Sequence, residues 1–291
     1  MATRALHRTG GFLHGYTHTL NPYVGCRFGC SYCYVAALPV ALRGGGRPWG
    51  DWASPKPELP ALLERDLIQL SARGRLDQTQ IFFGSATDPY QPLERRLEIT
   101  RRCLAAFARR PPGRLVLQTR SPLVQRDLEL LRQIPTLLVS LTIETDDEEV
   151  RRRFTPRCPP LELRWAAART LRAAGVELQI AAAPLLPHNP ARFAAQLAAS
   201  ADRVVVDTLL SGDGAGGRRS ATLPVVDQFN ANGLDWSDEQ PARALIARLR
   251  AVLGPGRVGF SCQGFNQLAR SVRAVRAVSR GAACPLPLET S

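Results

Sequence analysis

Short apolar segments alternate along the chain with longer segments in which apolar residues recur every three or four positions. The short segments predict strands, at residues 16–20, 80–83, 114–119, 137–143, 176–182 and 203–207. The clearest helical patterns between them are 93–109, 122–133 and 161–174, and Gly175 follows the last of these as a C-cap glycine would. Strands that alternate with helices are typical of βα units around a parallel sheet.

Six such units fit a partial, TIM-like (β/α)6 barrel of the α/β class, although an open doubly wound sheet gives the same pattern. In either architecture, ligands bind at the carboxyl ends of the strands. A cysteine-rich segment follows the first predicted strand, and the polar segment 84–90 follows the second. We therefore expect both segments at the same end of the sheet.

The barrel is predicted to span residues 1–210 of the 291-residue chain, with residues 211–291 forming a C-terminal helical extension packed on it. Residues 211–236 are Gly-rich and polar, which predicts a loop or lid. A helix at 237–253, a short strand at 258–261 and a basic helix at 266–280 are expected to follow.

The chain shows no apolar run of about 18 residues, the length that a membrane helix needs. Its first fifteen residues are polar and Gly-rich, unlike an export signal. We therefore expect a cytoplasmic protein without a membrane association.

The formal net charge of +13 favours contact with an anionic partner, such as nucleic acid, a phosphorylated metabolite or an acidic protein. The arginine pairs are scattered along the chain rather than pooled in one tract. Both a polyanion-binding surface and ordinary solvated helix faces are consistent with this distribution.

Three of the seven cysteines, Cys26, Cys30 and Cys33, fall within eight positions. An odd cysteine count with this crowding is a poor disulfide framework and a good metal signature. The spacing C-x3-C-x2-C lets one loop hold three corners of a 4Fe-4S cluster, whose complete ligand set would be four thiolates. A zinc site is the alternative, but it usually takes two close pairs of ligands, and the chain has no second C-x2-C.

The missing fourth thiolate defines the predicted chemistry. An iron without a protein thiolate can be chelated by the amino and carboxylate groups of S-adenosyl-L-methionine (SAM). An electron passed through the cluster into the sulfonium then breaks a carbon-sulfur bond, giving methionine and a 5′-deoxyadenosyl radical that abstracts hydrogen. Gly25 and Gly29 allow the loop to approach the cluster closely, and Tyr32 is placed to pack on the adenine.

The segment from Asn21 to Tyr34 resembles the cluster loop of the radical SAM superfamily, in the branch of spore photoproduct lyase and the DNA repair photolyase-like proteins. Segments 87–94, 119–127 and 173–187 resemble the same branch. This resemblance implies an external electron donor of the flavodoxin or ferredoxin type. It also implies SAM contacts from matched positions, namely Thr87, Asp88, Arg120 in place of a frequent lysine, and Ser140.

One departure from the branch concerns the hydrogen donor. Spore photoproduct lyase carries a cysteine shortly before the Asp-containing segment, whereas Ala86 stands at that place and no cysteine lies between Cys33 and Cys103. We therefore expect a different substrate or a different hydrogen donor.

Several other residues are candidates for the site or for the core. Cys103 lies in a helical pattern and is expected in the core. Side chains that could face the substrate or pack elsewhere are Cys158, Cys262, His18, His188, Asp207, Trp49 and Trp52.

The function favoured by these patterns is reductive cleavage of SAM followed by hydrogen abstraction from an anionic substrate such as nucleic acid. A second hypothesis is a nucleic-acid-binding protein whose iron-sulfur cluster is structural or redox-sensing. A third is radical SAM modification of a protein, peptide or metabolite, with the basic charge incidental.

Overall fold

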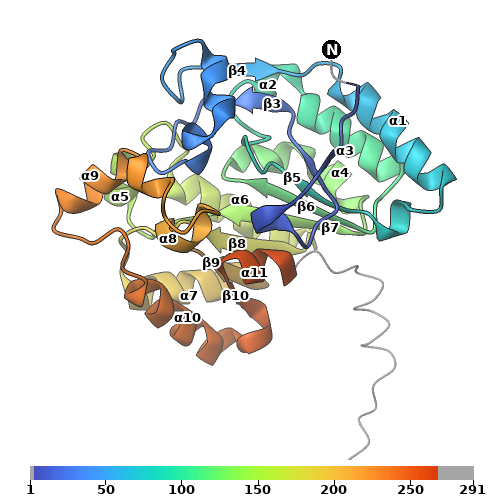
Figure 1. Cartoon of the computed structure of the whole chain (residues 1–291). Coiled ribbons are helices and arrows are strands. Elements are labelled where there is room, and N and C mark those ends of the chain that lie inside the picture. Colours follow the sequence, from blue (N-terminus) through green and yellow to red (C-terminus); the bar gives the residue numbers. More distant parts are fainter. Residues whose placement is uncertain (1–2, 268–291) are drawn as a thin grey trace, which may run out of the picture.

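The computed structural model describes residues 3–267, whose main element is a curved eight-stranded sheet (Figure 1). The strand order is β1-β2-β5-β6-β7-β8-β9-β10, and β1 pairs antiparallel with β2 while every later neighbour is parallel. The strands are β1 His7–Arg8, β2 His18–Leu20, β5 Gln80–Phe83, β6 Arg114–Thr119, β7 Leu137–Thr142, β8 Leu178–Ala182, β9 Arg203–Val206 and β10 Val258–Phe260.

This parallel sheet confirms the predicted α/β partial barrel, and all six predicted strands are present in it. Successive side chains of each strand point to opposite faces of the sheet, because a strand has a two-residue period. Phe82, Val116 and Leu138 are aligned on neighbouring strands and pack together inside the barrel. The residues that follow them, such as Phe83 and Leu117, pack in the main core against the helices.

Helices cover the outer face of the sheet (Figure 1). They are α1 Leu59–Ala72, α2 Glu94–Leu97, α3 Ile99–Arg109, α4 Leu128–Arg132, α6 Leu161–Ala173, α7 Pro190–Ser200 and α10 Gln240–Leu253. Helix α5, Glu148–Phe154, instead packs in a second apolar core with the cysteine-rich segment. Gly175 ends α6 as predicted, because its φ of +77° is the left-handed conformation that favours glycine.

Two predicted helices are interrupted. The pattern at 93–109 forms α2 and α3, separated at Glu98 with φ +51°. The cause is the buried carboxylate of Glu94, which accepts the backbone N–H groups of Thr100 (3.0 Å) and Arg101 (3.2 Å) and so starts a new helix. The pattern at 122–133 begins as a 3-10 helix, Pro122–Asp127, and only then becomes α4.

The region after β9 is more structured than its composition predicts. Residues 211–236, expected as a loop, contain the end of α8 (Leu209–Gly212) and the short helix α9 (Val225–Asn230). The predicted strand at 258–261 is β10, which pairs in parallel with β9 and therefore extends the barrel itself. Most of the predicted basic helix at 266–280 lies outside the described residues. Among residues 3–267, no helix is both long and apolar enough to cross a bilayer.

The sheet does not close between its edge strands, and α11 (Ser261–Gln267) fills the gap. Phe265 packs on Phe12 and Phe82, with ring centroids 5.8 and 6.4 Å apart. Its carbonyl accepts the Tyr16 hydroxyl at 2.9 Å, and the Asn266 side chain accepts the Gly15 backbone N–H at 2.7 Å. The helix thereby joins the N-terminal segment to the last strand.

We predict that Phe265→Ala destabilises the fold by about 3 kcal/mol, because it opens a cavity among buried aromatic rings. Urea denaturation followed by circular dichroism measures this change. Tyr16→Phe removes only one hydrogen bond and should cost about 1 kcal/mol. Equal effects of the two substitutions would show that α11 does not close the barrel through packing.

Candidate functional site

A cavity of about 560 Å³ opens at the carboxyl ends of the parallel strands. It is lined by residues that follow successive strands, among them Cys26, Ser85, Arg120 and Asp207. The cysteine-rich segment and the polar segment after β5 therefore meet in one place, as the alternation of elements predicts.

Cys26, Cys30 and Cys33 all line this cavity. Their loop begins after β3 (Tyr23–Gly25), which pairs with β4 (Ala53–Pro55) in a small antiparallel sheet. Gly25 adopts φ +81°, and a Cβ there would lie 2.7 Å from the ring of Trp52. Gly29 adopts φ +58°, with the Cα of Gly50 only 3.0 Å from the position of such a Cβ. Both glycines are therefore required by the path of the loop.

Cys26 and Cys30 are buried, each 8% exposed, and Cys33 is half-buried. Burial raises the pKa of Cys26 to about 12 and also raises the pKa of Cys33. These groups are consequently neutral at pH 7, and thiolates form when a metal centre displaces the protons.

Within residues 3–267, no three His, Cys, Asp or Glu side chains are arranged to hold a single metal ion. Three separate thiols on one loop, facing one cavity, fit a cluster in which each thiolate binds a different iron.

Neighbouring segments fix the cysteine loop. The backbone N–H of Ser31 donates to the carbonyl of Phe154 at 3.1 Å, and its hydroxyl donates to Gln228 at 2.6 Å. Trp49 and Cys33 pack against the same group of buried apolar side chains. A second apolar core, which includes Cys26, Cys30, Phe154 and residues of α9, lies under the loop.

A charged network borders the cavity beside the loop. Arg120, at the end of β6, donates to the Tyr32 hydroxyl and to Glu144, and its guanidinium carbon lies 5.6 Å from the Tyr32 ring centroid. Glu144 also accepts the buried guanidinium of Arg164 at 2.7 Å. Burial alone would raise the pKa of the Glu144 carboxyl, but Arg164 and Arg120 together lower it. One carboxylate thus balances two guanidiniums, and the network retains a positive charge.

Thr87 and Asp88 line the cavity after β5 and hold two segments together. The Thr87 hydroxyl donates to the carbonyl of Gly25 at 2.6 Å. The Asp88 carboxylate accepts the Thr119 hydroxyl at 2.6 Å, the Arg120 backbone N–H at 2.9 Å and the Tyr90 backbone N–H at 2.8 Å. From the cavity side, Thr87 therefore supports the cysteine loop and Asp88 supports the end of β6.

Ser140 lies deeper, fully buried on β7, where its hydroxyl accepts the Gln179 side chain at 3.0 Å. It is not among the residues that line the cavity.

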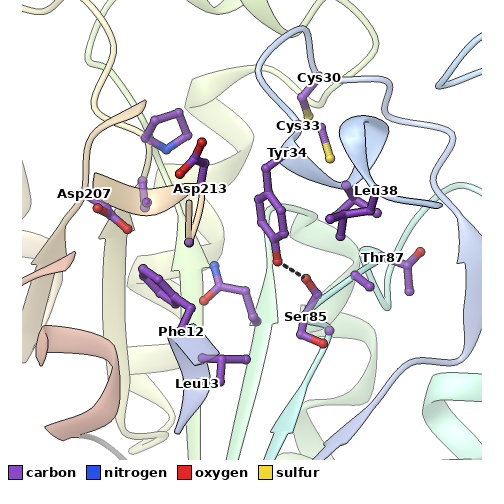
Figure 2. A pocket seen from close by; sticks show the side chains of 18 of the residues that line it. Phe12, Leu13, Cys30, Cys33, Tyr34, Leu38, Ser85, Thr87, Asp207 and Asp213 are labelled. Carbon is purple, nitrogen blue, oxygen red and sulfur yellow. Dashed lines mark hydrogen bonds between the residues drawn. The ribbon is translucent and has the colours of Figure 1, made fainter. Parts of the chain in front are cut away.

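Asp207 lies across the cavity from the cysteines, with Tyr34 between them (Figure 2). Its carboxylate accepts the Thr208 backbone N–H at 2.9 Å, and it fits there because residue 212 is glycine, whose Cβ would lie 2.6 Å from Asp207 Oδ2. Burial, together with the carboxylates of Glu239 and Asp213, raises the pKa of Asp207 to about 7.

The other residues that the sequence singled out lie in the core, in the cavity wall or in neither. Cys103 and Trp52 are core residues, whereas Trp49 lines the cavity. The lining residues do not include Cys158, Cys262, His18 and His188.

Sequence reasoning missed three residues that border or complete the site. Glu144 follows a strand and could have been found as an acidic residue at the carboxyl end of β7. Tyr34 donates to the carbonyl of Ser85 at 2.8 Å (Figure 2), and Asp213 accepts four backbone N–H groups of its own loop. No local signal marks these last two roles, because the Tyr34 contact joins segments distant in sequence and the Asp213 contacts depend on the fold of residues 213–220.

An uncharacterised protein of Methanocaldococcus jannaschii is 29% identical over 173 residues, which cover 60% of this chain and 62% of that protein. An uncharacterised protein of Mycobacterium tuberculosis is 28% identical over 59% of this chain and 50% of its own length. This chain therefore matches less than two thirds of these relatives.

Among solved structures, a substituted spore photoproduct lyase superposes with a TM-score of 0.60 at 14% identity, covering 89% of this chain and 79% of that one. Another form of that lyase, with bound SAM and dinucleoside spore photoproduct, gives a TM-score of 0.57 at 15% identity, covering 85% and 76%. Streptococcus suis SuiB bound to SAM gives 0.55 at 15% identity, covering 84% and 49%. These similarities establish the fold.

The family model of the radical SAM superfamily matches residues 20–194, which contain the cysteine loop and the strands from β5 to β8. The match covers more than half of the chain and agrees with the partial barrel and with its cavity. The chain belongs to the radical SAM superfamily, whose enzymes use a 4Fe-4S cluster and SAM.

Proposed function

We propose that Cys26, Cys30 and Cys33 hold the 4Fe-4S cluster and that the enzyme cleaves SAM to abstract hydrogen from a substrate in the cavity. The observation that supports this most is the position of all three thiols on one loop that lines the cavity. A cluster bound by these three thiolates would supply the electron for reductive cleavage of SAM, and an external flavodoxin- or ferredoxin-like protein is the expected electron source.

The chain's own residues would orient SAM. Arg120 offers a partly exposed cation for the SAM carboxylate, while Glu144 holds its guanidinium in place. Tyr32 is assigned to the adenine and Thr87 and Asp88 to nearby SAM contacts. A contact from the deeply buried Ser140 stays a prediction from the resemblance. The cytoplasmic location stays a prediction from the sequence pattern.

We predict that the reconstituted, dithionite-reduced protein converts SAM to 5′-deoxyadenosine and that Cys26→Ala abolishes this conversion. The substitution removes one thiolate, so iron content should fall as well. Chromatography of the products and iron analysis measure the two effects.

Cys103→Ala is the matched control, because Cys103 is fully buried in α3 and away from the cavity. It should retain both iron and turnover. A well-loaded wild-type protein that forms no 5′-deoxyadenosine would favour a structural or redox-sensing cluster instead.

A basic groove points to an anionic substrate. This groove, of about 520 Å³, runs between the N-terminal segment and α1 and is lined by Arg4, Arg8, Arg73 and Arg75. In the described part of the chain, none of these four guanidiniums forms an ion pair with a carboxylate. The acidic residue there, Asp66, is already engaged by the backbone N–H groups of Ala5 and Leu6.

The groove adjoins the cavity, since Arg8 lines both. A chain of phosphates could lie along the groove while one of its units enters the cavity. We therefore propose nucleic acid as the substrate class. A peptide or metabolite substrate is the alternative, for which the groove would have no role.

We predict salt-sensitive binding of single-stranded or duplex DNA, which the double substitution Arg73→Gln/Arg75→Gln weakens about tenfold. For duplex DNA, loss of two phosphate contacts should also reduce the slope of log affinity against log salt by about 2. Fluorescence anisotropy at several salt concentrations measures both quantities.

Arg248→Gln/Arg250→Gln is the charge-matched control, because it removes two exposed arginines from α10. Binding that is absent at low salt, or equally weakened by both double substitutions, would contradict nucleic-acid recognition by the groove.

Asp207 is placed to meet the substrate side of the cavity, and its raised pKa gives a pH signature. The unfolded carboxyl ionises near pH 4, whereas the folded one ionises near pH 7. The folded state therefore binds the extra proton in this interval, and the free energy of unfolding falls as pH rises through it.

We predict that Asp207→Asn, which cannot ionise, gains stability relative to the wild type as pH rises from 5 to 7, and that the difference then levels off. At about 1.4 kcal/mol per pKa unit, the two units between pH 5 and 7 correspond to a gain of about 3 kcal/mol. Thermal denaturation of both proteins across pH 5 to 8 measures the gain. A difference that is independent of pH would show that Asp207 is not a buried neutral acid.

A further inference from the structure

A fourth cysteine lies directly behind the cysteine loop. The sulfur of Cys158 is 3.7 Å from that of Cys30, within hydrogen-bond distance for two sulfurs, and only 4% of Cys158 is exposed. The two residues are 128 positions apart in sequence, so the fold brings them together.

The segment that carries Cys158 is firmly held. The buried guanidinium of Arg151 donates to the carbonyls of Thr155, Pro156 and Cys158 at 3.1, 3.2 and 2.9 Å. The backbone N–H of Cys158 donates to the carbonyl of Thr155 at 3.0 Å. The N-terminal side of this segment also meets the loop, because the Phe154 carbonyl accepts the backbone N–H of Ser31. Cys158 is therefore fixed against the loop from two directions.

Two other roles for Cys158 agree less well with this geometry. It does not line the cavity, so its thiol is not placed to return a hydrogen atom to a substrate there. Cys158 is also not placed to be a fourth cluster ligand. The 3.7 Å between its sulfur and that of Cys30 is the separation of two sulfurs on one metal ion with bonds of about 2.3 Å, and not that of thiolates on different irons.

We propose that Cys158 is a positioning residue for the cluster, whose S–H group donates a hydrogen bond to the sulfur of Cys30 when Cys30 ligates iron. This inference rests on the proposed function of the three loop cysteines. A donor to a ligating thiolate lowers the electron density on that sulfur and stabilises the added electron of the reduced cluster. Cys158 would thereby make the cluster easier to reduce by the external electron donor.

The first test uses the cluster-free protein and examines the contact alone. Diamide oxidises two adjacent thiols to a disulfide, and the two hydrogens pass to diamide, which becomes a hydrazine. We expect one disulfide between the peptides of Cys30 and Cys158 by mass spectrometry, with Cys103 left as a free thiol. Absence of this linkage would overturn the proposed contact, whether or not the protein binds a cluster.

The second test measures the midpoint potential of the reconstituted cluster by titration monitored with electron paramagnetic resonance. Cys158→Ala should retain the iron content of the wild type but shift the potential to a more negative value. Cys158→Ser keeps a donor group and should restore part of the shift, and Cys103→Ala should show none.

The outcomes distinguish the inference from the proposed function. An unchanged potential in Cys158→Ala would exclude the hydrogen bond, and loss of iron would make Cys158 a ligand instead. Failure of the wild type to assemble any cluster would overturn the proposed function, while the diamide result would still report on the contact.

Discussion

The interaction on which the site depends is the pairing of one buried carboxylate, Glu144, with two guanidiniums. Arg164 is fully buried and Arg120 is 15% exposed, so neither charge is well solvated. Removing Glu144 would leave both cations in a region of low polarity, which is far more costly than losing an exposed ion pair. The same carboxylate joins the end of β7 to the end of β6, to α6 and to Tyr32 of the cysteine loop.

A second carboxylate, Glu94, has a comparable role on the opposite side of the loop. Its side chain accepts the Tyr23 hydroxyl and the Arg126 guanidinium, and it also caps α3. Tyr23 lies just before the cysteines, so the entry of the loop is tied to the helical layer. The three thiols are thus presented by a segment with little regular structure of its own, and buried charge fixes its orientation.

The sequence predicted most of this architecture because strands and helices carry local periodicity. The six inner strands, the position of the cysteine loop and the end of α6 at Gly175 could all be read from residue patterns. Helix 93–109 was wrong as one element because the break at Glu98 is caused by a side chain four positions earlier. Glu144, Tyr34 and the Cys30–Cys158 contact depend on segments distant in sequence, and a local pattern contains no information about such partners. The side-chain roles proposed for SAM contacts stay predictions.

The gap in the barrel also bears on the order in which the site forms. Tyr16 and Phe265, which meet across this gap, are separated by 249 positions. Contacts of such long sequence separation carry a large loop-closure entropy and generally form late in folding. Phe265 and the N-terminal segment both line the cavity. The cavity is therefore complete on this side only when segments from opposite ends of the described chain have met.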